Sequence, residues 1–271
     1  MPHPQKASPV PVQQPVDAGC DACPVRAVDM FQGISKHLAA TLMDDIDHLV
    51  CPPRSTVYVR GETSPFVYVV RSGLIKLSHH STAGEERIVR ILKSGDTMGL
   101  EALFMDPHHC TATAIVEAHL CRVPVPLLEQ LEQDVPDFHR HLLREFQRSL
   151  NASEAVLTEL STGAARERVA RLLVFLAKKE EDAWLCTLIG RDDMGAILAI
   201  APESASRVIA ELRRSGIVGR CKGGVSACDL DRLVEIARGP GPIASESLLN
   251  LPWAKSHARD AEPYSLEDLG D

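Results

Sequence analysis

The sequence is poor in aromatic residues and has no long apolar run. Phe, Trp and Tyr make up 4% of its 271 residues, so a folded core must consist mainly of aliphatic side chains. No stretch approaches the roughly 20 apolar residues that a membrane-spanning helix needs. The Pro-rich start also has no apolar segment of the kind found in secretory signals. These absences favour a folded protein of the cytoplasm that has no membrane partner.

Two further absences narrow the function. The chain has no phosphate-binding loop, no G-x-S-x-G motif and no Ser/His/Asp set in a recognisable context, so we expect no enzymatic activity. Eight cysteines in a cytoplasmic chain argue against a disulfide framework. Two of them, Cys20 and Cys23, form a CxxC pair, a spacing that serves zinc sites and redox motifs alike.

The formal net charge of −8 is unevenly distributed along the chain. Residues 1–160 carry 14 Lys and Arg against 20 Asp and Glu, whereas residues 161–222 carry 11 against 8. Residues 239–271 are acidic again, with 2 against 6. A local positive excess matters more than the whole-chain sum for contact with phosphates, so the basic segment is the expected place for nucleic acid.

The N-terminal half alternates short β-rich segments with glycine turns. Residues 1–19 are rich in Pro, Gln and Ala without periodicity, which predicts a flexible arm over residues 1–30 that carries the CxxC. Residues 31–49 have the apolar spacing of an amphipathic helix. Over residues 54–126, alternation at period two and a turn about every 10 residues indicate an antiparallel barrel or roll. We therefore expect a sensor domain over residues 31–130.

A long helical pattern follows a short helix expected at residues 127–135. Residues 137–160 contain no Gly or Pro and correspond to ~24 residues, or ~36 Å of helix. A continuous apolar stripe on such a helix is typical of packing against a partner helix, and packing on the chain's own roll is the alternative. We predict a dimerisation helix over residues 131–160 of a homodimer, with an interface formed by Leu143, Phe146, Leu150 and Leu157.

The C-terminal region has the element order of a winged helix–turn–helix. A strand is expected at residues 184–189, two short strands at residues 217–230, and helices at residues 164–180, 191–200, 203–215 and 229–238. We predict a DNA-binding domain over residues 161–238, followed by an acidic, loosely ordered tail over residues 239–271. The expected fold class is α+β, with an antiparallel β-roll, a long helix and a C-terminal winged helix–turn–helix.

The second helix of the helix–turn–helix carries a face suited to reading bases. Glu203, Ser206 and Arg207 fall at i, i+3 and i+4, in the first turns that a recognition helix places in the major groove. Arg can donate two hydrogen bonds to guanine, and Glu can accept one from cytosine. Positive charge for phosphates comes from Arg213, Arg214 and Lys222. The alternative, a surface helix with a solvated Glu–Arg pair, is disfavoured by the surrounding helix–turn–helix pattern.

Two stretches resemble the Crp/Fnr family of transcription regulators. RDDMGAILAIAPESASRVIAELRRSGIV is similar to that family's helix–turn–helix signature, and VYVVRSGLIKLSHHSTAGEERIVRILKSGDTMGLEALF is similar to its roll pattern. The resemblance covers residues 20–238 and implies a dimer that binds a double-stranded DNA operator and RNA polymerase. In Fnr-like members a Glu-x-x-Ser-Arg trio reads a TTGAT half-site. The matching trio Glu203, Ser206 and Arg207 therefore implies a TTGAT-N4-ATCAA-like operator.

The resemblance allows two classes of effector, of which cyclic nucleotides are the first. Crp-like members hold the cyclic phosphate with an Arg-Ser pair beside a Gly-Glu turn of the cyclic-nucleotide-binding-like roll. Here Gly99 and Glu101 are present, but His108, His109 and Cys110 stand near where the Arg is expected. A phosphate without its fixed guanidinium loses its main charge-assisted contact, so cAMP is disfavoured.

Cysteine chemistry is the second class. Fnr-like members ligate an oxygen-sensitive 4Fe–4S iron–sulfur cluster with three arm cysteines and one roll cysteine. The resemblance implies Cys20 and Cys23 as arm ligands and Cys121 as the roll ligand. The third arm cysteine is missing, and Asp29 stands at one of its two family positions. Four thiolates are the usual complement of such a cluster, so this chain departs from the family pattern.

Three readings of the incomplete ligand set remain open. In the first, Asp29 is an oxygen ligand that completes the set. In the second, Cys51 or Cys110 takes the place of the missing cysteine. In the third, the cluster is lost and the CxxC acts as a redox-active thiol pair. The predicted function is a regulator that responds to oxygen or redox state through its N-terminal cysteines. The alternative is a Crp-like regulator with a small-molecule effector or a thiol switch and no cluster.

Overall fold

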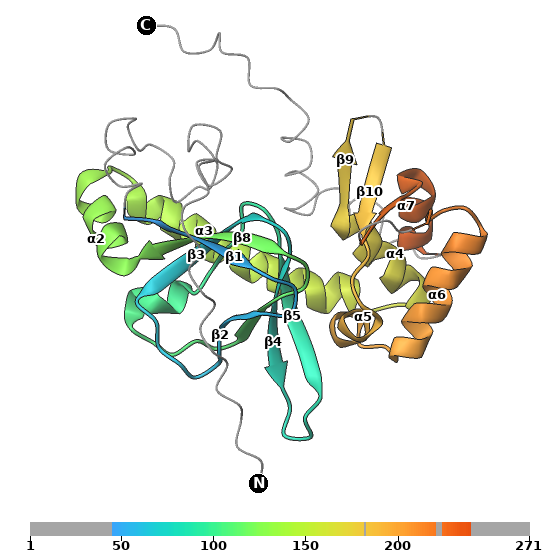
Figure 1. The fold of residues 1–271 in the computed structure, drawn as a ribbon, viewed down its shortest axis with the longest axis horizontal. Helices are drawn as coiled ribbons and strands as arrows, with labels where there is room; N and C mark the ends of the chain where they lie inside the picture. The colour runs from blue at the N-terminus through green and yellow to red at the C-terminus, as the bar shows by residue number, and fades with distance from the viewer. Residues whose placement is uncertain (1–44, 182, 221–223, 240–271) are drawn as a thin grey trace, which may run out of the picture. The chain divides into compact units, whose positions relative to one another are not determined.

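The computed structural model describes residues 45–181, 183–220 and 224–239 (Figure 1). Contacts within the chain divide it into two units, with the boundary between Leu150 and Asn151. The expected α+β class is confirmed, because antiparallel sheets precede a long helix and a helix–turn–helix with a small sheet follows. The expected N-terminal arm and C-terminal tail lie outside the described residues.

Two four-stranded antiparallel sheets form the roll of the first unit, with strand orders β1-β8-β3-β6 and β2-β7-β4-β5. The turn between β3 and β4 requires Gly73, because its φ is +86° and a Cβ there would lie 2.2 Å from the Glu117 carbonyl oxygen. The bounds are β1 Asp47–Cys51, β2 Thr56–Tyr58, β3 Phe66–Ser72, β4 Ile75–His80, β5 Glu86–Leu92, β6 Thr97–Met98, η4 Leu100–Phe104, β7 Thr111–Ala114 and β8 Ala118–Pro124.

Period-two alternation divides the apolar side chains of the roll between two cores. On β8, Leu120 belongs to the core between the sheets, together with Ile75 of β4. Cys121, the next residue, faces the other core, where helix α2 (Val125–Asp134) packs through Leu128. Successive strand residues point to opposite faces, so a one-residue shift along β8 would exchange the two environments.

The prediction of a helix over residues 31–49 is wrong at the C-terminal end of that range. Residues 31–44 lie outside the described residues. Strand β1 pairs with β8 from Asp47 to Cys51. In the extended conformation Leu49 and Cys51 both point into the roll core, where they are 4% and 0% exposed. Backbone pairing along five residues with burial of both side chains therefore overrides the helical spacing.

Most of the expected long helix forms, and it ends in an irregular turn. Helix α3 spans Phe138–Ala155, and a π-helical turn, η5, continues it over Val156–Leu160. The wider π turn changes the side-chain rotation set by the preceding α-helix. Val156 and Leu160 are buried, whereas Leu157 between them is 64% exposed.

The second unit contains α4 (Ala165–Leu176), α5 (Arg191–Leu198), α6 (Pro202–Arg214) and α7 (Leu230–Arg238), and a sheet of order β11-β10-β9 made of β9 (Ala177–Glu180), β10 (Ala183–Thr187) and β11 (Val225–Ala227). The helix expected over residues 164–180 is too long at its C-terminus. Residues 177–180 instead pair with β10 as an edge strand. The polar run there has no apolar period, so strand pairing decides its conformation.

No helix in the described ranges has the length and apolarity needed to cross a membrane.

A buried guanidinium ties the helices of the second unit together. Arg171 of α4 is 7% exposed, and its Nε donates to the Ala237 carbonyl of α7 at 2.8 Å. One terminal nitrogen donates to the carbonyls of Glu159 and Thr162 at 3.0 and 2.8 Å, and the other lies 3.6 Å from the Glu167 carboxylate. A buried cation is tolerated because it is paired and hydrogen-bonded. It fixes the scaffold on which α5 and α6 rest.

Candidate nucleic-acid interface

Helices α5 and α6 form the helix–turn–helix. Ala199 ends α5 in the left-handed region with φ 53°, and Pro202 begins α6, where its missing N–H has no intrahelical partner to lose. Gly195 of α5 lies against this turn, and a Cβ there would lie 2.9 Å from the Ile200 carbonyl oxygen. The missing side chain therefore lets the two helices meet in a tight turn.

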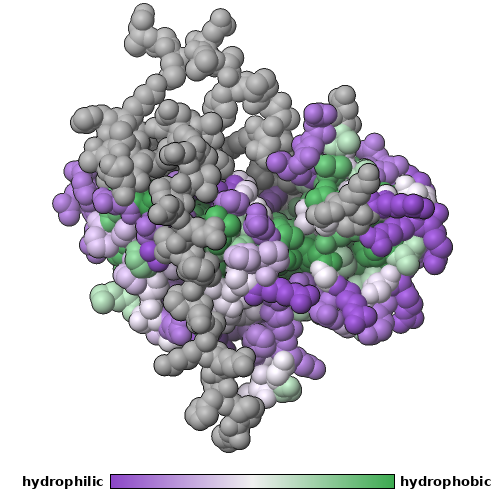
Figure 2. All heavy atoms as spheres, in the orientation of Figure 1, coloured by the Kyte–Doolittle hydropathy of each residue, from purple (hydrophilic) through white to green (hydrophobic). Residues whose placement is uncertain are grey.

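Helix α6 buries one face and exposes the other. Its buried residues recur every three or four positions, as expected for an amphipathic helix, and are Ala205, Val208, Ile209 and Leu212. Glu203, Ser206 and Arg207 are all exposed. Hydrophilic residues cover much of the visible outer edge of this unit in Figure 2. The predicted trio thus lies together on a helix that is fixed from behind.

The guanidinium of Arg207 is not tied to its neighbouring carboxylate. Its Nε donates only a long, 3.4 Å hydrogen bond to the Glu203 backbone carbonyl. Within the described part of the chain, no ion pair joins the Arg207 and Glu203 side chains. Both side chains therefore keep their hydrogen-bonding groups available for a ligand in solvent.

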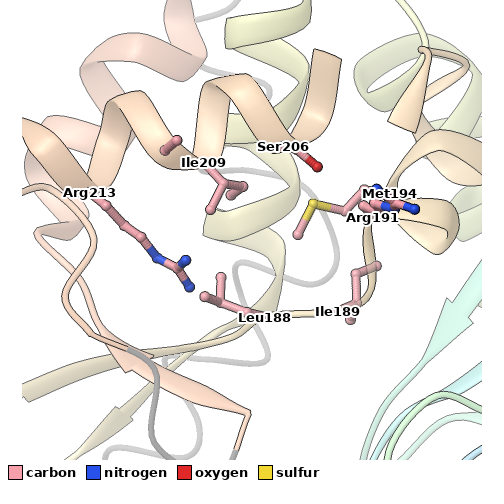
Figure 3. A pocket seen from close by; sticks show the side chains of 8 residues that line it. Leu188, Ile189, Arg191, Met194, Ser206, Ile209 and Arg213 are labelled. Carbon is pink, nitrogen blue, oxygen red and sulfur yellow. The ribbon is translucent and has the colours of Figure 1, made fainter. Parts of the chain in front are cut away.

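A hollow of about 210 Å³ lies beside α6 and brings in a residue that the sequence reasoning left out (Figure 3). Its apolar lining includes Met194 of α5 and Ile209 of α6, while Ser206 and Arg213 lie about two turns apart on α6. Arg191, the first residue of α5, also lines it. The only sequence signal for Arg191 was its place as the first letter of the helix–turn–helix motif.

Of the three cations predicted to contact phosphates, the structure describes Arg213 and Arg214. Arg213 and Arg214 are exposed in the last turn of α6 and make no ion pair with any other described residue. The acidic Glu211 beside them is already paired, because Arg166 Nε lies 2.8 Å from its carboxylate. The exposed end of α6 is therefore positively charged. Lys222 lies outside the described residues.

The expected effector segment of the roll holds a buried histidine and a carboxylate. The His108 side chain is fully buried and stacks on Tyr58, with ring centroids 3.8 Å apart. Its Nδ1 lies 3.9 Å from Glu101 Oε2, and the backbone N–H of His109 donates to the same carboxylate at 3.3 Å. Burial raises the pKa of Glu101, but the nearby His108 ring and hydrogen bonds from the backbone outweigh it and lower the pKa to about 2.

A thiol–imidazole contact lies in the same segment. Cys110 Sγ is 3.2 Å from His79 Nε2 on β4. Burial raises the pKa of the Cys110 thiol, and burial together with the charge of Arg60 lowers the pKa of His79. Both shifts favour the uncharged forms, so the pair is a neutral S–H and imidazole near pH 7.

Only one of the expected cluster ligands lies in the described residues. Cys121 is 2% exposed in the core beneath α2, among apolar neighbours. Cys51 belongs to the other core, between the sheets, so the two thiols do not share an environment. Cys20, Cys23 and Asp29 lie outside the described residues. Across the described ranges, no group of three or more His, Cys, Asp and Glu side chains is arranged to hold a metal ion.

The predicted dimer residues divide into two groups. Leu143, Leu150 and Leu157 are 64%, 59% and 64% exposed and are spaced seven residues apart. Phe146 instead packs partly against the roll core, with its ring centroid 6.1 Å from that of Phe104. The exposed apolar stripe of α3 therefore consists of Leu143 and Leu150, and Leu157 is exposed in the π turn that follows.

Comparisons with known proteins agree with this arrangement. The chain matches the cyclic nucleotide-binding domain over residues 49–134 and the Crp-like helix-turn-helix domain over residues 167–236. The transcriptional regulator LdrP of Thermus thermophilus is 30% identical over 184 residues, which cover 66% of this chain and 91% of LdrP. The transcriptional activator protein Anr of Pseudomonas aeruginosa is 27% identical over 207 residues, covering 73% of this chain and 85% of Anr.

Solved structures share both units. A CRP-family transcriptional regulator from Thermus thermophilus has a TM-score of 0.57 at 28% identity, covering 72% of this chain and 99% of that one. FixK2 of Bradyrhizobium japonicum has a TM-score of 0.64 at 22% identity over the same shares, a likeness of fold. A cyclic nucleotide-binding-like roll followed by a Crp-like helix–turn–helix defines a DNA-binding transcription regulator, not an enzyme. The chain belongs to the Crp/Fnr family.

Proposed function

We propose that this regulator binds a TTGAT-N4-ATCAA-like palindrome as a homodimer, with the first turns of each α6 in a major groove. The two-faced character of α6 carries the proposal. Glu203, Ser206 and Arg207 are exposed together, while Val208 and Leu212 are buried behind them. A recognition helix needs both features, because base contacts require side chains that reach outward from a fixed support.

Each member of the trio has a distinct role in this proposal. Arg207 donates two hydrogen bonds to O6 and N7 of a guanine, and Glu203 accepts one from N4 of a cytosine. Ser206 contacts a base or a phosphate. The exposed Arg213 and Arg214, with Lys222, contact phosphates, which adds affinity without sequence preference.

The leucine stripe supports the proposed homodimer, and a palindromic operator has one half-site for each subunit. Leucines at seven-residue spacing are typical of a seam between two helices, and Leu143, Leu150 and Leu157 keep most of their surface exposed in the single chain. Two subunits then present two recognition helices to half-sites about one helical turn apart. We expect the DNA-bound dimer to act in the cytoplasm by contacting RNA polymerase.

We propose oxygen or redox state as the signal, sensed through the N-terminal cysteines and Cys121. An anaerobic regulatory protein of Haemophilus influenzae is 24% identical over 204 residues, which supports this assignment. The apolar, water-excluding surroundings of Cys121 suit an iron–sulfur ligand. Cys20, Cys23 and Cys121 would hold the cluster, with Asp29 as the fourth ligand. A bound cluster would supply reversible, oxygen-sensitive redox chemistry.

A second candidate is a Crp-like regulator whose signal is a small molecule or a thiol reaction in the roll. The contact between Cys110 and His79 favours it, because this thiol stands near the position expected for a phosphate-binding Arg. An imidazole that accepts the thiol proton assists reaction of the sulfur with an electrophile. In this case the protein responds to thiol reagents when it contains no iron.

Fluorescence anisotropy with the full-length protein tests the DNA function. A labelled duplex with the palindrome is compared at several salt concentrations with a scrambled duplex of equal composition. We expect a preference of about 10³-fold or more for the palindrome, the range of specific regulators. Equal affinity for both duplexes at every salt concentration contradicts the proposed operator.

Anaerobic purification distinguishes the two signals. With a cluster, the protein is brown, contains iron and sulfide, and bleaches in air, and Cys121→Ser abolishes the colour. Cys110→Ser is the matched control, because it removes a roll thiol outside the proposed ligand set. A colourless, iron-free protein after anaerobic reconstitution rejects the cluster. Operator binding that then responds to a thiol reagent only when Cys110 is present supports the second candidate.

A further inference from the structure

Two cysteines of the second unit lie on the same face of its small sheet. In the antiparallel pairing of β10 with β11, Cys186 is opposite Ser226. The Cys228 backbone N–H extends this pairing by donating to the Trp184 carbonyl at 2.8 Å. Side chains two residues apart on a strand point to the same side. Cys228 is therefore a diagonal neighbour of Cys186 on the same face of the sheet.

The two thiols differ in exposure and acidity. Cys186 is fully buried, whereas Cys228 is only half-buried. The neighbouring Cys186 lowers the pKa of Cys228 below its ordinary value, and the neighbouring Cys228 together with burial raises the pKa of Cys186. The Cys186 thiol itself donates to the Leu173 carbonyl at 3.5 Å. Redox-active thiol pairs have this asymmetry, because one accessible thiolate reacts with the oxidant and a protected thiol resolves the product.

We propose that Cys186 and Cys228 form a reversible disulfide when a hydroperoxide oxidises the protein. The Cys228 thiolate attacks one peroxide oxygen, the O–O bond breaks, and Cys228 becomes a sulfenic acid. With hydrogen peroxide, the leaving hydroxide takes up the Cys228 proton and becomes water. The Cys186 sulfur then attacks the sulfenic sulfur, an S–S bond forms, and a second water leaves with the Cys186 proton. Two thiols and one hydrogen peroxide thus give one disulfide and two waters.

The position of the pair determines what the disulfide would do. Both helices of the helix–turn–helix, α5 and α6, lie between Cys186 and Cys228 in the chain. The disulfide closes a loop around them and removes conformational entropy from the unfolded state. Diagonal neighbours on a sheet are farther apart than an ideal disulfide requires. The bond is therefore strained, and mild reductants should reverse it. This inference is independent of the proposed operator and of the N-terminal cysteines.

Peptide mapping of the full-length protein tests the linkage directly. Trypsin separates the relevant cysteines, because residues 180–191 contain only Cys186, residues 223–232 only Cys228, and residues 221–222 only Cys221. The protein is treated with hydrogen peroxide, its remaining thiols are alkylated under denaturing conditions, and it is digested without reductant. We expect the peptide of residues 180–191 linked to that of residues 223–232. Dithiothreitol should release both.

Thermal unfolding gives a second readout that needs no DNA. Oxidation should raise the midpoint of the wild type by about 5–10 °C, and dithiothreitol should reverse this increase. Cys228→Ser should lose both the cross-link and the increase, and Cys221→Ser, the matched control, should keep both. Separate alkylation of the two peptides after peroxide treatment overturns the proposal, as does a cross-link from Cys186 to Cys221. If Cys228→Ser does not fold, peptide mapping of the wild type still decides.

Discussion

The Glu145 carboxylate of α3 accepts a hydrogen bond from the Thr97 hydroxyl of β6 at 2.5 Å, and both residues are 2% exposed. Arg148, one turn later, donates to the other carboxylate oxygen at 3.1 Å. A buried carboxylate is stable only when it is paired or hydrogen-bonded, so this contact fixes the rotation of α3 on the roll. Leu143 and Leu150 remain exposed as a result.

Removing the Thr97 hydroxyl should weaken the first unit. Thr97→Val keeps the shape of the side chain but removes one hydrogen-bond donor from the buried Glu145 carboxylate. We expect a loss of about 1–3 kcal/mol in the free energy of unfolding, measured by urea titration. Thr82→Val, at an exposed position, is the matched control. A loss no larger than that of the control would show that Glu145 does not depend on the hydroxyl.

A charge in the leucine stripe should prevent dimerisation. Leu150 is 59% exposed in the single chain and is buried in the proposed seam. Leu150→Glu should yield monomers in sedimentation and lose operator binding, because an unpaired charge would be desolvated in the interface. Arg144→Glu also adds negative charge to an exposed α3 position, off the stripe, and should remain dimeric. A Leu150→Glu dimer of unchanged strength excludes this seam.

Two arginines of α6 should affect DNA binding in different ways. Arg207→Ala should weaken binding to the palindrome by about 1–3 kcal/mol and relax selection at one base pair. Arg214→Ala should weaken binding to all duplexes nearly equally and lower the salt slope by about one, because it removes a phosphate contact. Anisotropy with single-base operator variants measures both effects. If Arg207→Ala keeps full selectivity, Arg207 does not read a base.

Glu101 should make the stability of the roll depend on pH. Its pKa in the folded protein is about 2, below the ordinary value of 4.5. Because the pKa of Glu101 is lower in the folded protein than in the unfolded chain, its charged form stabilises the fold at pH values above about 4.5. This stabilisation is lost as the pH falls from about 4.5 toward about 2. Glu101→Gln should therefore cost about 1–3 kcal/mol at pH 7, and the difference from wild type should shrink below pH 4.5.

Thermal midpoints between pH 3 and pH 7 measure this prediction. Glu62→Gln is the control, since Glu62 is exposed in the same unit. The difference in thermal midpoint between wild type and Glu101→Gln could instead stay constant over the whole pH range. In that case His108 and the backbone do not stabilise the charge of the carboxylate.

Local periodicity determined much of the second unit. The apolar spacing of Val208 and Leu212 and the i, i+3, i+4 placement of the trio already specify α6 and its two faces. One turn of helix brings such residues together whatever surrounds it. The sequence also located the helix–turn–helix and the long helix, which end within a few residues of their expected limits, apart from the π turn.

Tertiary structure alone decided which distant segments meet. Residues 47–51 and 177–180 become strands because partners far away or across a turn pair with them, and helical spacing in the first segment concealed this. Cys186 and Cys228 are 42 residues apart in the chain, and only the register of β10 with β11 makes them neighbours. A period along the chain fixes which side of a helix or strand a residue occupies. Long-range pairing and burial fix what faces it.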